Sequence, residues 1–282
     1  MKIVYCGFDF FSNCLSSLVA AKHEIVEVFS YKGNSRYNSC LDVVGQSEHI
    51  GCPVYFRPVN SQDIARFESI KVDLLIAAAY PYKIPVEGLK AVYGVNIHPS
   101  LLPQGRGCWP LPHFILRGLS HAGVTIHKLA DRFDAGDILL QESFEVDTVR
   151  ETMESLSMKA RLSAQRLLDR FVASPGKFWT AATQQIGGEY WGLPTTAEQT
   201  VDWNQSVELI DRMIRAFGKC DSMGLLDGKQ WVFKDATVWK EKHTFSCGEV
   251  VLRSSREILV AAKDGFVCLR FYELDPDCIG KL

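Results

Sequence analysis

The chain has 282 residues, of which 47% are hydrophobic and 23% are charged, and its formal net charge is −2 at pH 7. This composition is ordinary for a folded globular protein, and it gives no overall positive charge for a nucleic acid or an anionic membrane. The length allows one large domain or two smaller ones. No apolar run approaches the roughly 20 residues of a membrane helix, so we expect no membrane partner.

The N-terminus and the cysteines predict a cytoplasmic protein. Residues 1–7 are typical of a first strand that runs directly into a turn, rather than of a signal peptide. The nine cysteines are scattered, and no Cys-x-x-Cys pair occurs among them. Together these features favour reduced thiols and argue against a structural zinc site.

Short apolar runs alternate with helical patterns through the first hundred residues. Strands are expected at 2–6, 25–29, 53–56, 72–79 and 92–97. Helices are expected at 11–21, with Ser12 as a candidate N-cap, at 40–50 and at 63–69. Such alternation is typical of right-handed βαβ units with a parallel sheet.

The remaining residues predict a change of architecture. A helix at 109–118, a strand pair at 123–129 and 138–144, and a long helix at 149–172 complete the first part. A helix at 206–217 then precedes short β runs at 231–233, 236–239, 249–252, 258–261 and 266–272. We predict an α/β protein with an open, mostly parallel twisted sheet of the Rossmann-like kind. Its expected parts are a catalytic domain at 1–180, a linker at 181–201, and a C-terminal helix with a small β-barrel-like (OB-like) domain at 202–282.

One polar stretch, residues 96–137, concentrates groups that can do chemistry. Asn96 and His98 lie at the end of an expected strand, and ligands bind beyond the carboxyl ends of strands in open α/β sheets. Asp134 follows in a turn with small residues, from which a carboxylate can reach the imidazole. An amide, an imidazole and a carboxylate suit the transfer of an acyl-level carbon between two amines.

Other interpretations of these residues stay open. Each could be structural, with Asn96 capping a turn, His98 packing and Asp134 forming an Asx-turn. A metal site formed with His127 lacks the usual ligand spacing, so we expect no metal. A dinucleotide-binding oxidoreductase is disfavoured, because residues 7–10 contain no Gly-x-Gly-x-x-Gly turn.

Three motifs resemble the folate-dependent formyltransferase family, which includes methionyl-tRNA, glycinamide ribonucleotide and sugar N-formyltransferases. They are Asn-Ile-His-Pro-Ser-Leu-Leu-Pro at 96–103 with Arg106-Gly107, Gly-Val-Thr-Ile-His at 123–127, and Asp-Ala-Gly-Asp-Ile-Leu at 134–139. The resemblance implies an N-formyltransferase that uses 10-formyltetrahydrofolate as co-substrate, with Asn96, His98 and Asp134 as its catalytic triad. It leaves open whether His98 acts as a base or stabilises an oxyanion.

The resemblance also implies a folate pocket formed largely by backbone groups of two segments. The cofactor-binding candidates are Ala78, Ala79, Tyr80, Tyr82, Ile84, Asp131 and Asp137. For Tyr80 and Tyr82 the alternative is that they are ordinary aromatic residues at a strand end.

The amine acceptor is predicted from charge and from the first loop. Residues 181–282 carry 12 Lys and Arg against 15 Asp and Glu, and residues 1–180 carry 19 against 18. Neither part is basic, and Gly-Phe-Asp-Phe-Phe at 7–11 departs from the Gly-Thr-Pro-x-Phe opening of the tRNA enzymes. We therefore expect a nucleotide-linked amino sugar. Its binding candidates are Arg106, Trp109, Arg132, Tyr190 and Trp191.

Four alternatives remain at this stage. They are a methionyl-tRNA formyltransferase, a formyltransferase for a small amine or hydroxyornithine in natural-product synthesis, a deformylase with water as acceptor, and a non-catalytic folate-binding protein. A homodimer is compatible with the sequence.

Overall fold

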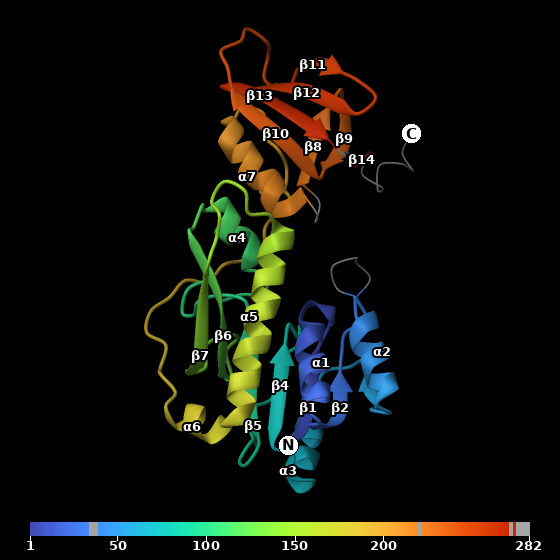
Figure 1. Ribbon diagram of the computed structural model, residues 1–282, viewed down its shortest axis with the longest axis vertical. Coiled ribbons are helices and arrows are strands. Elements are labelled where there is room, and N and C mark those ends of the chain that lie inside the picture. Colours follow the sequence, from blue (N-terminus) through green and yellow to red (C-terminus); the bar gives the residue numbers. More distant parts are fainter. Residues whose placement is uncertain (34–38, 219–221, 271–272, 275–282) are drawn as a thin grey trace. The chain divides into compact units, whose positions relative to one another are not determined.

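The computed structural model describes residues 1–33, 39–218, 222–270 and 273–274 (Figure 1). These residues form two compact units. The first comprises Met1–Pro110, Ala122–Phe144 and Met158–Gly192. The second comprises Leu111–His121, Glu145–Ser157 and the described residues from Leu193 onward. The boundaries expected from the sequence stay a prediction, but two short segments inside 1–180 group with the C-terminal residues.

A seven-stranded sheet forms the centre of the α/β part, in the order β3-β2-β1-β4-β5-β6-β7. Its strands are β1 (Lys2–Gly7), β2 (Glu24–Phe29), β3 (Val54–Tyr55), β4 (Leu74–Ala78), β5 (Tyr93–His98), β6 (His121–Lys128) and β7 (Ile138–Glu145). Strands β1 to β5 pair in parallel, and β6 pairs with β5 in the antiparallel sense. Every residue of β4 is buried, which explains its continuous apolar run. The prediction of a mostly parallel sheet is confirmed.

Helices flank this sheet (Figure 1). They are α1 (Ser12–Ala20), α2 (Leu41–His49), α3 (Ser61–Ser69), α5 (Met153–Ala173) and α6 (Pro175–Thr180), whereas α4 (Leu111–Leu116) belongs to the second unit and contacts the helix at Val207–Phe217. Ser12 was wrongly expected as an N-cap: it is the first residue of α1, and a short 3-10 turn, Asp9–Phe11, precedes it. Helix α3 begins before the expected 63, because Asn60 and Asp63 form a capping box at its start. No helix among the described residues is both long and apolar enough to cross a membrane.

The C-terminal part of the second unit contains one helix and an all-antiparallel β region. Helix α7 (Val207–Phe217) begins at Ser206, whose side chain accepts a hydrogen bond from the Leu209 amide. One sheet has the order β10-β13-β12-β11 and the other β14-β9-β8. The strands are β8 (Ser222–Leu226), β9 (Lys229–Phe233), β10 (Asp235–Lys240), β11 (Val250–Arg253), β12 (Glu257–Ala262), β13 (Gly265–Arg270) and β14 (Glu273–Leu274).

Five of these strands match the expected β runs, and the last two positions of the run at 266–272 lie outside the described residues. Strand β8 was missed, because its sequence, Ser-Met-Gly-Leu-Leu, has no β-branched residue. It pairs with β9 across Asp227 and Gly228, which both have positive φ, as the hairpin dipeptide predicts.

Candidate active site

The site is built on the pairing of β5 with β6. Asn96 and His98 are alternate residues of β5, so their side chains share one face of the sheet. In the antiparallel register Asn96 lies opposite His127, and His98 lies opposite Thr125. The strand pair therefore brings a second imidazole beside the amide of Asn96.

Asp134 reaches the same place from the loop between β6 and β7. It has a φ of 54°, a left-handed conformation that aspartate adopts more readily than most other residues. Two residues on, a Cβ at Gly136 would collide with the carbonyl oxygen of Lys128, so this loop can lie against β6 only with glycine there. The local sequence thus suits the loop geometry that brings Asp134 to the site.

The three side chains predicted as catalytic lie together. Oδ1 of Asp134 is 3.2 Å from Nδ2 of Asn96 and 3.4 Å from Nδ1 of His98. Its other oxygen, Oδ2, accepts a hydrogen bond of 2.9 Å from the backbone N–H of Gly107. His98 and Asp134 are both buried, whereas Asn96 is partly exposed. A carboxylate is thereby fixed between an amide and an imidazole.

The tautomer of His98 follows from its partners. Its Nε2 lies 2.7 Å from the carbonyl oxygen of Gly105, which can only accept, so Nε2 carries a proton. In the neutral ring Nδ1 is then unprotonated, and its lone pair faces the carboxylate of Asp134. The ring therefore offers one vacant proton site, next to a negative charge.

His127 is a member of the site that the sequence suggested only as a metal ligand. Its Nδ1 lies 2.8 Å from its neighbour's carbonyl oxygen, that of Lys128, and must donate to it. Its Nε2, 3.0 Å from Nδ2 of Asn96, therefore accepts from the amide. Both N–H groups of Asn96 are thus directed at acceptors, His127 and Asp134. Only the strand register, which sequence alone does not give, reveals this contact.

The electrostatics of the pair leave the carboxyl ionised and the imidazole neutral. Burial lowers the pKa of His98, an effect that the charge of Asp134 offsets only in part. Burial alone would raise the pKa of Asp134, but His98, His127 and the Gly107 amide outweigh it, and that pKa is lowered. At neutral pH the site therefore contains one negative charge and one unoccupied basic nitrogen.

The first predicted folate segment leaves the carboxyl end of β4. Ala78 is the last residue of that strand, and Ala79 has a φ of 57°. The hydroxyl of Tyr80 donates to the carbonyl oxygen of Arg57 and accepts from the Val59 amide, so it is already used within the protein.

The other residues predicted for folate binding belong to two loops, which an ion pair connects. Tyr82 stacks edge-on against Tyr80, and Ile84 is buried. In the second segment, Oδ1 of Asp131 lies 3.6 Å from Nζ of Lys83. Oδ2 of Asp137 lies 3.2 Å from Nζ of Lys128. The contact of Asp131 with Lys83 brings the two predicted segments side by side.

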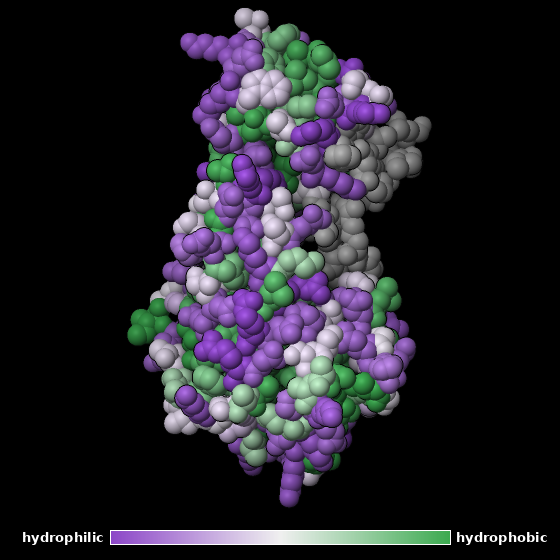
Figure 2. Space-filling view, viewed as in Figure 1, coloured by the Kyte–Doolittle hydropathy of each residue, from purple (hydrophilic) through white to green (hydrophobic). Residues whose placement is uncertain are grey.

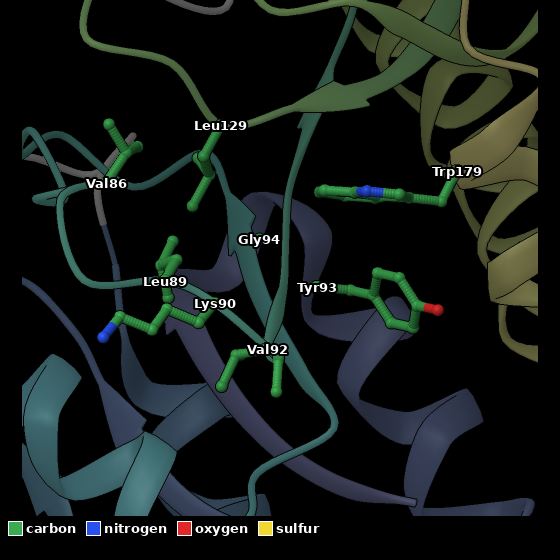
Figure 3. Close-up of a pocket in the computed structure, with 9 residues that line it drawn as sticks. Val86, Leu89, Lys90, Val92, Tyr93, Gly94, Leu129 and Trp179 are labelled. Atoms are coloured by element: carbon green, nitrogen blue, oxygen red, sulfur yellow. The ribbon is translucent and has the colours of Figure 1, made fainter.

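A pocket of about 180 Å³ lies at the amino end of β5 (Figure 3). Val86 and Leu89 follow Ile84 along the chain, and Leu129 precedes Asp131. Figure 3 shows leucine and valine side chains on one side of the opening and the rings of Tyr93 and Trp179 on the other. Gly94, also in the lining, lies two residues before Asn96 on the same face of β5, about 7 Å away between Cα atoms, and the side chains of Leu89 and Leu129 lie over it. The sequence had not indicated this pocket.

The five residues predicted to bind the acceptor have different surroundings. Arg132 is exposed, Trp109 is partly buried and Tyr190 is 60% exposed, whereas Trp191 is only 3% exposed and packs against Gly105. Nε and Nη2 of Arg106 donate to Oε1 of Gln185 at 2.9 and 2.7 Å. Base stacking by Trp191 would require this ring to move, so the others are better placed for a ligand.

No group of three or more His, Cys, Asp or Glu that could hold a metal occurs within the part of the chain that the structure describes. The amide, imidazole and carboxylate of Asn96, His98 and Asp134 can transfer protons and form hydrogen bonds.

Comparison with known proteins places this arrangement in a family. A methionyl-tRNA formyltransferase of Anaplasma marginale is 31% identical over 77% of this chain and 74% of its own length. A methionyl-tRNA formyltransferase of Latilactobacillus sakei is 28% identical over 98% of this chain and 90% of its own.

Two solved structures share the fold. The N-formyltransferase of Helicobacter canadensis, in complex with folinic acid and dTDP-3-aminofucose, aligns over 97% of this chain and 100% of its own, with 16% identity and a TM-score of 0.72. HypX of Aquifex aeolicus in complex with tetrahydrofolic acid aligns with 19% identity and a TM-score of 0.73. The present chain spans 47% of the HypX chain.

Two family descriptions match the chain in order. Residues 4–172 match formyl transferase, and residues 195–277 match the formyl transferase C-terminal domain. The first match alone covers more than half of the chain and contains Asn96, His98, His127 and Asp134. The chain belongs to the folate-dependent formyltransferase family.

Proposed function

We propose that the protein transfers the formyl group of 10-formyltetrahydrofolate to the amino group of a nucleotide-linked amino sugar. The observation that carries the chemistry is the carboxylate of Asp134, held between Asn96 and a neutral His98 whose Nδ1 faces it at 3.4 Å. This pair can take one proton from an attacking amine and return it to the leaving nitrogen.

The reaction proceeds through an addition and an elimination. The lone pair of the amine forms a bond to the formyl carbon, and the carbonyl electrons move to its oxygen. The proton lost by the amine is taken up by the Asp134–His98 pair, where Nδ1 of His98 is the vacant site. The oxyanion then re-forms its carbonyl, the bond to N10 breaks, and N10 receives the proton. General base catalysis of this kind contributes about 10²–10⁴-fold.

Asn96 supplies the oxyanion donor in this scheme. Its two N–H groups point at His127 and Asp134 before the reaction. When Nδ1 of His98 gains a proton, Oδ1 of Asp134 turns to that new N–H and releases one N–H of Asn96. A donor aimed at a developing oxyanion stabilises the transition state by a few kcal/mol. His98 therefore acts as base, and its protonation frees the amide that stabilises the oxyanion.

The donor's ring system fits the pocket lined by Leu89, Gly94 and Leu129. Its volume of about 180 Å³ is below the roughly 300–1,000 Å³ of sites for drug-sized ligands, so it suits one ring system rather than a whole folate. A ring bound there lies at the amino end of β5, so the rest of the donor would extend along the strand for its formyl group to reach Asn96. The replacement Leu129→Trp should fill the pocket and weaken folate binding in calorimetry, with circular dichroism unchanged. Unaltered affinity would place the ring elsewhere.

The acceptor assignment rests on charge. The second unit contains 14 Lys and Arg against 18 Asp and Glu, and it is therefore acidic on average. A tRNA acceptor needs several cationic contacts to its phosphates, whereas a sugar nucleotide needs one or two. Arg132 and Tyr190, both exposed, can meet a pyrophosphate and a base.

Initiator tRNA is the second candidate, because methionyl-tRNA formyltransferases are similar along nearly the whole chain. Incubation with 10-formyltetrahydrofolate and a panel of amino-sugar nucleotides, ornithine derivatives or charged initiator tRNA separates the two. Product folate is followed by absorbance. Sugar-nucleotide formylation supports the proposal, and formylation of tRNA alone overturns the acceptor.

The same assay tests the triad. Alanine at Asn96, His98 or Asp134 should abolish most turnover while circular dichroism stays unchanged. Near-normal rates in all three variants would refute the catalytic assignment.

A homodimer stays a prediction. Figure 2 shows hydrophobic residues gathered over the sheet of β11 to β13, where Leu252 on the outer strand β11 is 55% exposed. Light scattering of the native chain and of a Leu252→Lys variant tests whether this strand mediates association.

A further inference from the structure

The segment that follows α6 does not simply connect two domains. Thr183 exchanges two backbone hydrogen bonds with Ile138, at 2.8 and 2.9 Å. Farther on, the Arg106 amide donates to the carbonyl oxygen of Glu189, and the Trp191 amide donates to that of Arg106. The segment thus pairs at one end with the start of β7 and at the other with the loop that carries Gly107.

Between these two anchor points, the side chain of Gln185 links the loops that form the site. Its Nε2 donates to the carbonyl oxygens of Asp134 and Gly136, at 2.9 and 2.6 Å. Its Oε1 accepts from Nε and Nη2 of Arg106. The amide therefore uses both of its donors on the Asp134 loop and its oxygen on the Arg106 loop.

The two loops joined by this contact hold the two ends of one catalytic hydrogen bond. Asp134 supplies the carboxylate that accepts, and Gly107, next to Arg106 in the chain, supplies the N–H that donates. Asp134 is in a left-handed conformation, and the direction of its side chain depends on how the backbone of this turn is held. Hydrogen bonds to the carbonyl oxygens of Asp134 and Gly136 hold the turn from behind.

We propose that Gln185, supported by Arg106, is a positioning residue that fixes the carboxylate of Asp134 against His98. This inference rests on the proposed function, because it assigns the contact a role in formyl transfer. It also gives Arg106 a role other than the substrate contact expected from the sequence. The geometry of the catalytic pair then depends on a residue outside the motifs, in the segment expected to be a linker.

The replacement Gln185→Ala tests the proposal. We call the hydrogen bonds of Gln185 to the Asp134 loop and to Arg106 the clamp. Loss of the clamp should lower kcat about 10–100-fold, since a misplacement of about 1 Å costs catalysis that much. The KM for the folate should stay within about threefold of wild type. The matched control is Gln184→Ala, which truncates the exposed neighbour and should match wild type in both constants. Gln185→Glu keeps the acceptor for Arg106 but loses the donors, so it should also lose kcat.

A second readout does not need turnover. The charge of Asp134 raises the pKa of His98, so a displaced carboxylate should let that pKa fall further below that of wild type. Histidine titration by NMR on the ligand-free full chain measures this shift in Gln185→Ala and Gln185→Glu against Gln184→Ala. Circular dichroism tests whether the variants are folded. If Gln185→Ala does not fold, Gln185→Glu is used for the comparison.

The outcomes separate the two hypotheses. If both Gln185 variants retain wild-type kcat and wild-type His98 titration, the clamp is refuted while the proposed function stands. If the wild-type protein formylates no amine, the proposed function fails, and the titration alone decides the clamp. A double variant with Arg106→Ala should lose no more than the stronger single variant. Additive losses with a raised KM for the acceptor would instead make Arg106 an independent substrate contact and overturn the joint role.

Discussion

The most informative single replacement at the site is Asp134→Asn, which removes a charge and keeps the shape. The carboxylate lies 3.4 Å from Nδ1 of His98, the nitrogen that takes up a proton in the proposed mechanism. At an effective dielectric constant of about 20, unit charges at this distance attract by about 5 kcal/mol. An amide dipole recovers part of this energy, so we expect a loss of about 3–5 kcal/mol. That corresponds to a fall in kcat of about 10²–10⁴-fold.

The folded state should tolerate this replacement. Asparagine adopts positive φ more readily than most residues, which suits the φ of 54° at Asp134. The new amide oxygen can accept from the Gly107 N–H, and the new N–H can donate to Nδ1 of the neutral His98, but the hydrogen bond from Asn96 is lost. The stability should therefore fall by only about 1 kcal/mol in thermal denaturation. The pKa of His98 should fall further, because the charge that raises it is gone.

The assay compares kcat from tetrahydrofolate formation in wild type, Asp134→Asn and Asp169→Asn. Asp169 is an exposed carboxylate on α5 that accepts from Ser17, so its replacement controls for the loss of one negative charge. A kcat within about threefold of wild type for Asp134→Asn would refute the reasoning, since the charge could not then be stabilising a protonated His98.

Three further predictions concern stability. Folding lowers the pKa of His98, so as the pH falls the unfolded chain takes up this proton before the folded chain does. The contribution of His98 to the free energy of unfolding is therefore full above about pH 6.5 and is lost at lower pH. The urea midpoint of a His98→Asn variant should depend less on pH than that of wild type. Gly136→Ala should destabilise the folded protein by about 3 kcal/mol or more, because the new Cβ clashes with Lys128. Gly45→Ala, at a position of α2 with open space around it, should stabilise the protein by up to about 1 kcal/mol. Thermal denaturation compares the two variants. Tyr80→Phe should cost about 1 kcal/mol of stability with an unchanged KM for the folate, and a raised KM would show that its hydroxyl contacts the ligand.

The elements that sequence predicted well are those whose pattern is local. The apolar run of β4 and the polar residues at the end of β5 identified a sheet and its functional edge. The proximity of the three residues could be expected because Asn96 and His98 are two residues apart on one strand, and because Asp134 lies in a turn of small residues; their catalytic role stays a prediction. These features need no knowledge of which distant segments meet.

The contacts that the sequence did not predict all join segments that are distant along the chain. His127 lies beside Asn96 through an antiparallel register that shifts with any bulge or turn. Gln185 reaches Asp134 across 51 positions of the chain, from a segment with little periodic pattern. Tyr80 was expected at a ligand, yet its hydroxyl is bonded to backbone groups at 57 and 59, which belong to a different loop.

The location of these contacts bears on how the two halves of the reaction are specified. Asp134 forms hydrogen bonds with Asn96, Gly107 and Gln185 and an ion pair with His98, and all four of these residues belong to the first unit. The groups that the proposed mechanism uses for formyl transfer are therefore held by contacts within one unit. The second unit carries 14 Lys and Arg against 18 Asp and Glu. A tRNA acceptor would need several cationic contacts to its phosphates, so this acidic unit supports the proposed small nucleotide acceptor, whose candidate contacts Arg132 and Tyr190 also lie in the first unit.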